Sequence, residues 1–114
     1  MMTELQISNT DGITRAVLQG RLDSGTVDRI ELNFTAGIVP VGKPAVVDLT
    51  DVTFLASLGI RMLLSTARTL DRRGAKLALF GASPAVMEIM ETVALTEIVP
   101  VLDTESEAVA LVTA

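Results

Sequence analysis

The chain has 114 residues, of which 49% are hydrophobic and only three are aromatic, and it carries a net charge of −5 at pH 7. This length fits one domain, spanning residues 1–114, that buries roughly two-thirds of its unfolded surface. The absence of Cys and His excludes disulfides, cysteine metal sites, thiolate nucleophiles and the commonest general base. An all-carboxylate Mg²⁺ or Ca²⁺ site would need a ligand loop whose spacing the chain does not show, and no nucleophile–base pair is present, so we expect no metal, no cofactor and no catalytic residue.

The charge balance and the apolar runs also limit the partners. Nucleic acid binding needs clustered cations and stacking rings, which an acidic chain with three Phe lacks. No apolar run approaches the ~18 residues of a membrane span, and no basic segment leads into an apolar stretch at the N-terminus. We therefore expect a cytoplasmic protein without nucleic acid or membrane partners.

The first part of the chain predicts a β-hairpin. Apolar and polar residues alternate from Leu5, and again from Ile13 to about Gln19. Between them, Asn9-Thr10-Asp11-Gly12 has the composition of a turn. Residues 20–25, rich in Gly and polar side chains, are predicted to form a loop.

A helix and a buried strand follow. Apolar residues have helical spacing from Val27 to Ile38, with Gly37 and Pro40 as termination signals. Residues 45–49, rich in β-branched side chains, are typical of a buried parallel strand.

The second half predicts three helices and two strands. A long helix begins near Ser57 and ends near Arg72, a strand covers 76–80, and Ser83 with Pro84 marks the next helix start. A short edge strand is expected over 98–101. The last helix opens with a capping box in which Thr104 and Glu107 pair.

Alternating strands and helices indicate an α/β fold with helices packed on a sheet. The initial hairpin makes the sheet mixed. We therefore predict a mixed, mostly parallel five-stranded sheet with about four helices.

The helix predicted to begin near Ser57 has apolar residues on two sides. A helical wheel indicates which side faces the core. The wheel places one set on the core side: Ile60, Leu63, Leu64, Ala67 and Leu70. It places Leu58 and Met62, four residues apart, on the outward side next to Arg61, where they would form a docking patch.

Several polar residues around this helix have an ordinary structural explanation. Ser57 is predicted as an N-cap, worth about 1 kcal/mol. Asp48 and Asp51 are predicted to lie in a turn at the end of a strand, and Asp23 is predicted to be a loop carboxylate. From position alone, none of them needs a further role.

Four motifs in order nevertheless resemble the STAS family, whose best known members are anti-sigma factor antagonists. The motifs are Gly20-Arg21-Leu22-Asp23, Asp48-Leu49 followed by Ala56-Ser57-Leu58-Gly59-Ile60, Gly74-Ala75-Lys76-Leu77, and the Ser-Pro-led helix. The chain departs from the family pattern at two positions: Ala56 stands where Asp is usual, and Leu58 replaces a second Ser.

The resemblance implies a switch protein that is not an enzyme. Its partner would be an anti-sigma factor that is also a serine kinase, bound while Ser57 is unphosphorylated. A metal-dependent serine phosphatase would restore the binding form. The implied phosphorylation site is Ser57, and the implied partner-binding residues are Asp23, Ser24, Ala56, Ser57, Leu58, Gly59, Arg61 and Met62.

Three alternatives remain at this point. A non-switching STAS subunit could dock on a transporter ATPase through the outward face of the same helix. A small-molecule or nucleotide-binding module would place its site near Asp48 and Ser57. An enzyme would use Asp23 and Asp48 as paired carboxylates.

Overall fold

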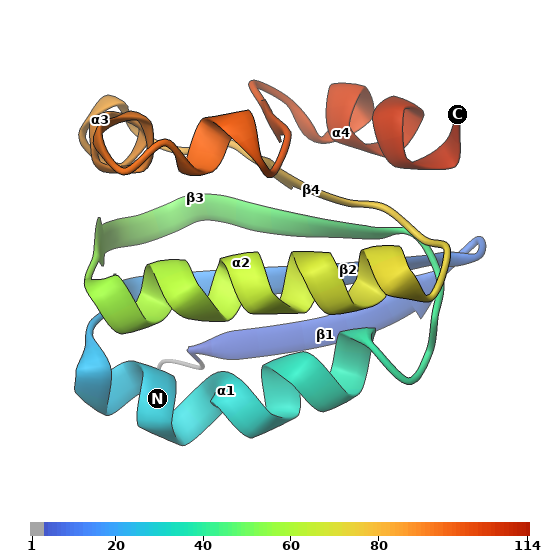
Figure 1. Ribbon diagram of the computed structural model, residues 1–114, viewed down its shortest axis with the longest axis horizontal. Coiled ribbons are helices and arrows are strands. Elements are labelled where there is room, and N and C mark those ends of the chain that lie inside the picture. Colours follow the sequence, from blue (N-terminus) through green and yellow to red (C-terminus); the bar gives the residue numbers. More distant parts are fainter. Residues whose placement is uncertain (1–3) are drawn as a thin grey trace.

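A five-stranded sheet, in the order β1-β2-β3-β4-β5, forms the centre of the computed structural model, which describes residues 4–114 (Figure 1). The strands are β1 Leu5–Thr10, β2 Ile13–Leu22, β3 Ala45–Leu55, β4 Leu77–Phe80 and β5 Val101–Leu102. The helices are α1 Ser24–Ile38, α2 Ser57–Arg72, α3 Pro84–Thr92 and α4 Glu105–Thr113, with a short 3₁₀ turn at Leu95–Glu97. The predicted fold class is confirmed.

The sheet is mixed in the predicted way. β1 and β2 form an antiparallel hairpin, whereas the β2–β3, β3–β4 and β4–β5 pairs are parallel. β5 is an edge strand, as expected, but it covers 101–102 and not 98–101. Pro100 directly precedes the strand, where its missing N–H costs no ladder hydrogen bond.

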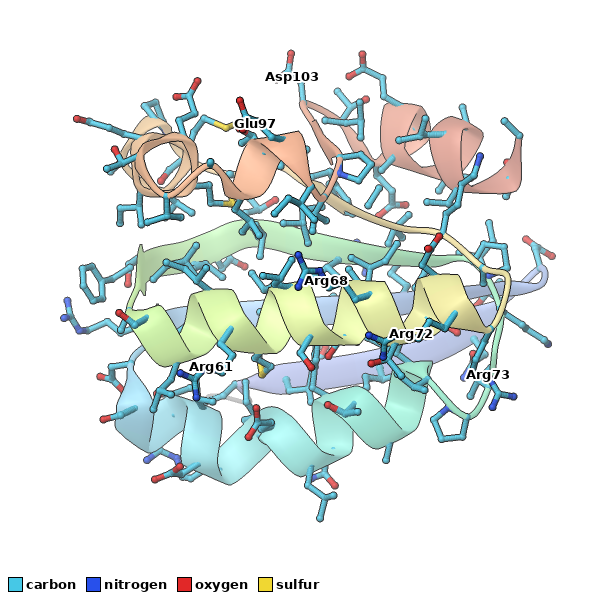
Figure 2. All side chains as sticks on the ribbon, in the orientation of Figure 1. Arg61, Arg68, Arg72, Arg73, Glu97 and Asp103 are labelled. Carbon is cyan, nitrogen blue, oxygen red and sulfur yellow. The ribbon has the colours of Figure 1, made fainter. Side chains whose placement is uncertain are left out.

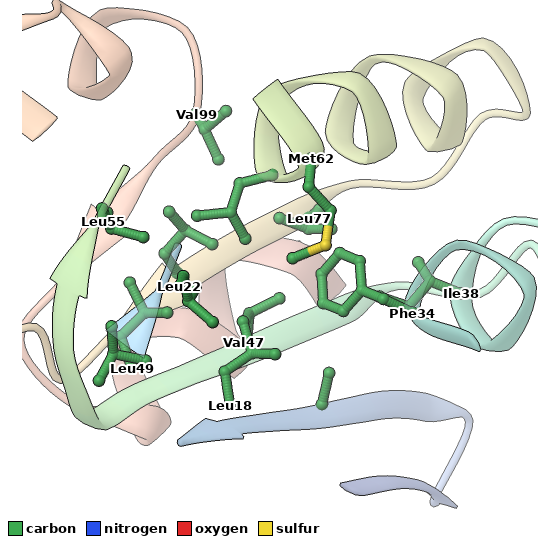
Figure 3. Close-up of a cluster of buried hydrophobic side chains, with 14 of the residues drawn as sticks. Leu18, Leu22, Phe34, Ile38, Val47, Leu49, Leu55, Met62, Leu77 and Val99 are labelled. Carbon is green, nitrogen blue, oxygen red and sulfur yellow. The ribbon is translucent and has the colours of Figure 1, made fainter. Parts of the chain in front are cut away.

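Alternate residues of the central strands supply two separate cores. Val47 and Leu18 belong to the larger cluster, which α1, α2 and α3 cover (Figure 3). Val46 and Phe80 point to the opposite face, where they pack against Ala108 and Val112 of α4. β3 is therefore buried on both faces, which explains why it reads as a continuous apolar run.

β2 and β3 both extend further than the sequence predicted. Residues 20–22 are strand and not loop, and Ser24 already lies in α1. β3 continues six residues beyond Leu49, so Asp48 and Asp51 lie inside a strand and not in a strand-end turn. The β2–β3 register shifts between Val17 and Gln19 and again after Gly20, which disrupts the period-two pattern that would have revealed these extensions.

The predicted orientation of α2 is wrong by part of a turn. Leu63 and Leu70 are buried as expected, but Ile60, Leu64 and Ala67 are only partly buried. Met62, predicted to face outward, is 1% exposed and points toward Phe34 of α1 (Figure 3). Because α1 packs alongside α2, the buried side of α2 is rotated toward α1, and the sequence of one helix does not contain that information.

The predicted caps of the last two helices are confirmed. The Ser83 hydroxyl accepts from the Val86 N–H at 3.3 Å. Thr104 and Glu107 form the capping box that starts α4. Within residues 4–114, no helix has the length and apolar composition needed to cross a membrane.

The packing of α2 can be tested by truncating two adjacent side chains. Met62→Ala should lower the free energy of unfolding by about 2–4 kcal/mol, because it leaves a cavity beside Phe34. Arg61→Ala, the matched control on the exposed side, should change it by no more than about 0.5 kcal/mol. Urea unfolding of both variants measures the difference, and equal effects would contradict this orientation.

Candidate functional site

Two helices start side by side at the carboxyl end of the β2–β3 pair. Leu22 and Leu55, the last residues of these strands, are register partners. α1 begins two residues after Leu22, and α2 begins two residues after Leu55. The Ala56 N–H donates to the Leu22 carbonyl oxygen at 3.0 Å and joins the two connections. This edge therefore brings together Asp23, Ser24, Ala56 and Ser57, and it is where sites gather in open α/β sheets.

Ser57 is the first residue of α2 and not its N-cap. The N-cap is Ala56, whose extended backbone (φ −91°, ψ 172°) begins the helix without a side-chain hydrogen bond. The prediction of Ser57 as cap is therefore wrong by one residue. Its hydroxyl is exposed at the head of a helix whose first-turn amides receive no side-chain cap.

Gly59 lets the first turn of α2 lie directly against the end of β2. A Cβ at this position would stand 2.8 Å from the Leu22 carbonyl oxygen and 3.0 Å from its Cβ. Real Cβ atoms do not approach a backbone oxygen so closely, so any larger residue must displace the helix. Gly59 is buried, and its place in this structure is a packing contact below Ser57.

Asp23 caps α1 beside this turn. Its Oδ1 accepts from the Thr26 backbone N–H at 3.0 Å, so it is an N-cap and not a loop carboxylate. That hydrogen bond is the main reason that the pKa of Asp23 lies below its ordinary value, and the positive charges of Arg21 and Arg29 lower it further. Asp23 is thus a fixed negative charge at the site edge.

Arg21 and Phe54 also belong to this edge and were not predicted. They are register partners on β2 and β3, and the Arg21 guanidinium lies 4.4 Å from the centre of the Phe54 ring. Arg21 Nε also stands 3.9 Å from Asp23 Oδ2. The pair could not be predicted from the sequence, because the β2–β3 register shifts twice before it reaches Arg21 and Phe54.

The remaining predicted site residues differ in exposure. Arg61 is exposed, Leu58 is partly buried against the larger core, and Met62 is fully buried. The predicted patch of Leu58 and Met62 therefore does not exist as an outward surface. Of the predicted site residues, Ser24, Ser57 and Arg61 are exposed at this edge, and Asp23, Ala56 and Leu58 are partly exposed.

Asp48 lies apart from this group. It stands seven residues before the end of β3, roughly 20 Å along the strand. Its carboxylate accepts from Arg15 at 3.2 Å and from the Thr50 N–H at 2.9 Å. The structure thus brings Asp48 together with neither Ser57 nor Asp23, which removes the geometric basis for the nucleotide site and the paired-carboxylate enzyme. No group of three or more carboxylates within 4–114 is arranged to hold a metal ion.

Comparison with known proteins identifies the family of the chain. The model of the STAS domain matches residues 4–108. The chain belongs to the STAS family. This confirms the resemblance seen in the four motifs.

The relatives have related names. BtrV of Bordetella bronchiseptica, provisionally named as an anti-sigma factor antagonist, is 30% identical over 107 residues, which cover 94% of this chain and 92% of BtrV. The anti-sigma-B factor antagonist of Listeria monocytogenes is 27% identical over 91% of this chain and 90% of its own length. This STAS protein is thus a distant relative of anti-sigma factor antagonists, which are regulatory proteins and not enzymes.

A solved structure agrees in fold. The anti-sigma factor antagonist SpoIIAA in its unphosphorylated form superposes with a TM-score of 0.76 at 22% identity, covering 96% of each chain. The structure of Bacillus SpoIIAA in its phosphorylated form superposes with a TM-score of 0.66 at 21% identity, covering 95% of this chain and 98% of that one.

Substitution at Gly59 tests the close contact below Ser57. Gly59→Ala should destabilise the STAS domain by about 1–2 kcal/mol, because the clash with Leu22 exceeds the gain in helix propensity. The matched control is Gly25→Ala in the first turn of α1, where the nearest atoms to a new Cβ lie at 3.6 and 3.7 Å. The control should gain about 0.4–1 kcal/mol in chemical unfolding, and a gain at Gly59 as well would refute the contact.

The cap at Asp23 predicts a pH dependence. Because the folded-state pKa of Asp23 is lowered, its contribution to stability is present above the unfolded-state pKa and is lost as pH falls through the folded-state pKa. Asp23→Asn keeps the cap but removes the titration. The stability difference between wild type and Asp23→Asn should therefore change with acidification in this range, in unfolding curves recorded at stepped pH, and a constant difference would argue against the shift.

Proposed function

We propose that this STAS protein is an anti-sigma factor antagonist controlled by phosphorylation of Ser57. Unphosphorylated, it binds an anti-sigma factor that is also a serine kinase, and phosphorylation ends the binding. A metal-dependent serine phosphatase reverses the modification. The exchange takes place in the cytoplasm, where the kinase has access to ATP.

The observation that carries the proposal is the exposed hydroxyl of Ser57 at the first position of α2. A kinase can reach a side chain that no cap holds. A phosphate there would meet the positive end of the helix dipole and the free first-turn amides, which favour an anion. Phosphorylation would therefore be tolerated without unfolding the helix.

Ala56 favours the modified form further. Where the family usually has Asp, a carboxylate at the N-cap would occupy the first-turn amides and repel the phosphate. Ala56 makes no side-chain cap, so the amides stay available. The departure from the family pattern is thus compatible with phosphorylation at the next residue.

Release of the partner would follow from charge and bulk. The Ala56–Leu22 hydrogen bond and the Gly59 contact hold the first turn of α2 against β2, so the site has little freedom to rearrange. A phosphate adds about −1.5 to −2 charges. It would stand next to the partly exposed Leu58 and the fixed charge of Asp23, where it would disrupt an interface by desolvation and repulsion.

The test compares two serines that have equivalent positions. Ser24 and Ser57 are both exposed first residues of helices at the same edge. Phosphosite mapping after incubation with the cognate kinase should identify Ser57. Ser57→Asp should weaken kinase binding at least about tenfold, equivalent to 1.4 kcal/mol, while Ser57→Ala and Ser24→Asp should bind as wild type.

Equal binding by Ser57→Asp and wild type would remove the switch from Ser57. Phosphorylation of Ser24 in place of Ser57 would move the switch to α1. If wild type, Ser57→Asp, Ser57→Ala and Ser24→Asp all bind a transporter ATPase equally well without any kinase present, the chain is the non-switching STAS subunit.

A further inference from the structure

Charge is distributed very unevenly along this acidic chain. Residues 61–76 contain five of its nine basic side chains and one of its fourteen acidic ones, a net charge of +4. The other residues together carry −9, and 77–114 contain six carboxylates and no basic residue. α2 and the turn that follows it therefore form a positive strip on a negative molecule.

Three arginines form a row along the exposed side of α2. Arg61, Arg68 and Arg72 are seven and four residues apart, so they fall within about 40° of one another on the helix. Figure 2 shows them on the side of α2 that faces the viewer, with Glu97 and Asp103 far from them at the upper margin. Within residues 4–114, the ion pairs involve Arg15, Arg21 and Arg29, and none involves this row.

A groove with an apolar floor lies beside the row. Its volume is about 600 Å³, and Leu77, Val99 and Leu111 line it, with Arg68, Arg72 and Lys76 as cations at its wall. Ile98, which also lines it, is 51% exposed. Asp71 supplies a single carboxylate.

A smaller hollow continues from the groove toward the head of the helix. It has a volume of about 230 Å³ and is lined by Arg61, Leu64 and Ser65, and it shares Arg68 and Arg72 with the groove. The row itself spans 11 residues, about 16 Å of helix. The combined surface is long and narrow, which suits a polypeptide segment better than a compact small molecule.

We propose that the arginine row and its groove bind an acidic segment of a protein partner, with one apolar side chain of that segment seated over Leu77 and Val99. The identity of the partner rests on the proposed function: it is the anti-sigma factor with serine kinase activity. Unpaired arginines attract carboxylates and steer an acidic segment, while the −9 charge elsewhere repels it from other surfaces.

Ser57 lies at the head of the same row. It precedes Arg61 by four residues, a spacing at which side chains on a helix are neighbours. A phosphate on Ser57 therefore pairs with the Arg61 guanidinium and places negative charge where the acidic segment would begin. Phosphorylation thus weakens docking along the whole row, in addition to blocking the edge near Asp23.

The first experiment measures binding of a labelled peptide of about eight residues, all Glu except one central Leu, a length that spans the row and groove. Arg68→Glu should weaken binding about tenfold. Lys43→Glu, the same charge change at an exposed residue outside the row, should stay within about twofold after correction for net charge. Ile98→Ser should weaken binding, whereas Val93→Ser, with 49% exposure outside the groove, should not.

Four results would overturn the proposal. The first is failure of the peptide to bind wild type at millimolar concentration, and the second is equal binding by Arg68→Glu and Lys43→Glu. Complete competition by inorganic phosphate, with no effect of Ile98→Ser, would reduce the row to a site for simple anions. If sedimentation shows that the wild-type chain self-associates and that Arg68→Glu abolishes this, the groove binds a second copy of this chain and not the partner's acidic segment.

A second experiment separates this proposal from the proposed function. Peptide binding by Ser57→Ala should equal that of wild type, and enzymatic phosphorylation of Ser57 should weaken it. If no kinase modifies Ser57 while the peptide still binds the row, the switch fails and the docking surface stands. If Ser57→Asp releases the kinase while Arg68→Glu still binds it as tightly as wild type, the switch stands and the docking surface fails.

Discussion

The contact between Gly59 and the Leu22 carbonyl group is the constraint on which the site depends. It lets α2 begin directly above the end of β2, while the Ala56 N–H donates to the same carbonyl oxygen. Because both helices start from neighbouring strand ends, Ser57 is held beside Asp23 although 33 residues separate them in sequence. A residue with a Cβ at position 59 would lift the helix and separate these two groups.

Local signals in the sequence were sufficient for most of the fold. The hairpin around Asn9–Gly12, the cap at Ser83 and the capping box at Thr104 depend on a few adjacent residues, and each forms as expected. The orientation of α2 was not accessible in this way. Apolar residues cover two sides of that helix, and only the position of α1 decides that Met62 is buried.

The start of α2 was predicted to within one residue, but the surroundings of Ser57 were not. Ser57 and Asp23 do lie at one edge, yet Ser57 is not a cap, and Asp48 belongs to a different part of β3. The two register shifts in the β2–β3 pair account for this, since they extend both strands beyond the point where alternation stops. Arg21 and Phe54 were missed for the same reason.

The extended ends of β2 and β3 determine how the site is attached to the rest of the sheet. Beyond Gln19 and Leu49, β2 and β3 pair with each other, whereas β1 ends its pairing at Leu18 and β4 at Asp48. The site therefore stands on a two-stranded ribbon that projects from a five-stranded body. Isolated ribbons of this kind are marginally stable in water, so α3 and the helix starts supply its support. Leu22, Val52 and Leu55 of this ribbon are buried in the larger core, so the site is attached to the body through side-chain packing and not through further strand pairing.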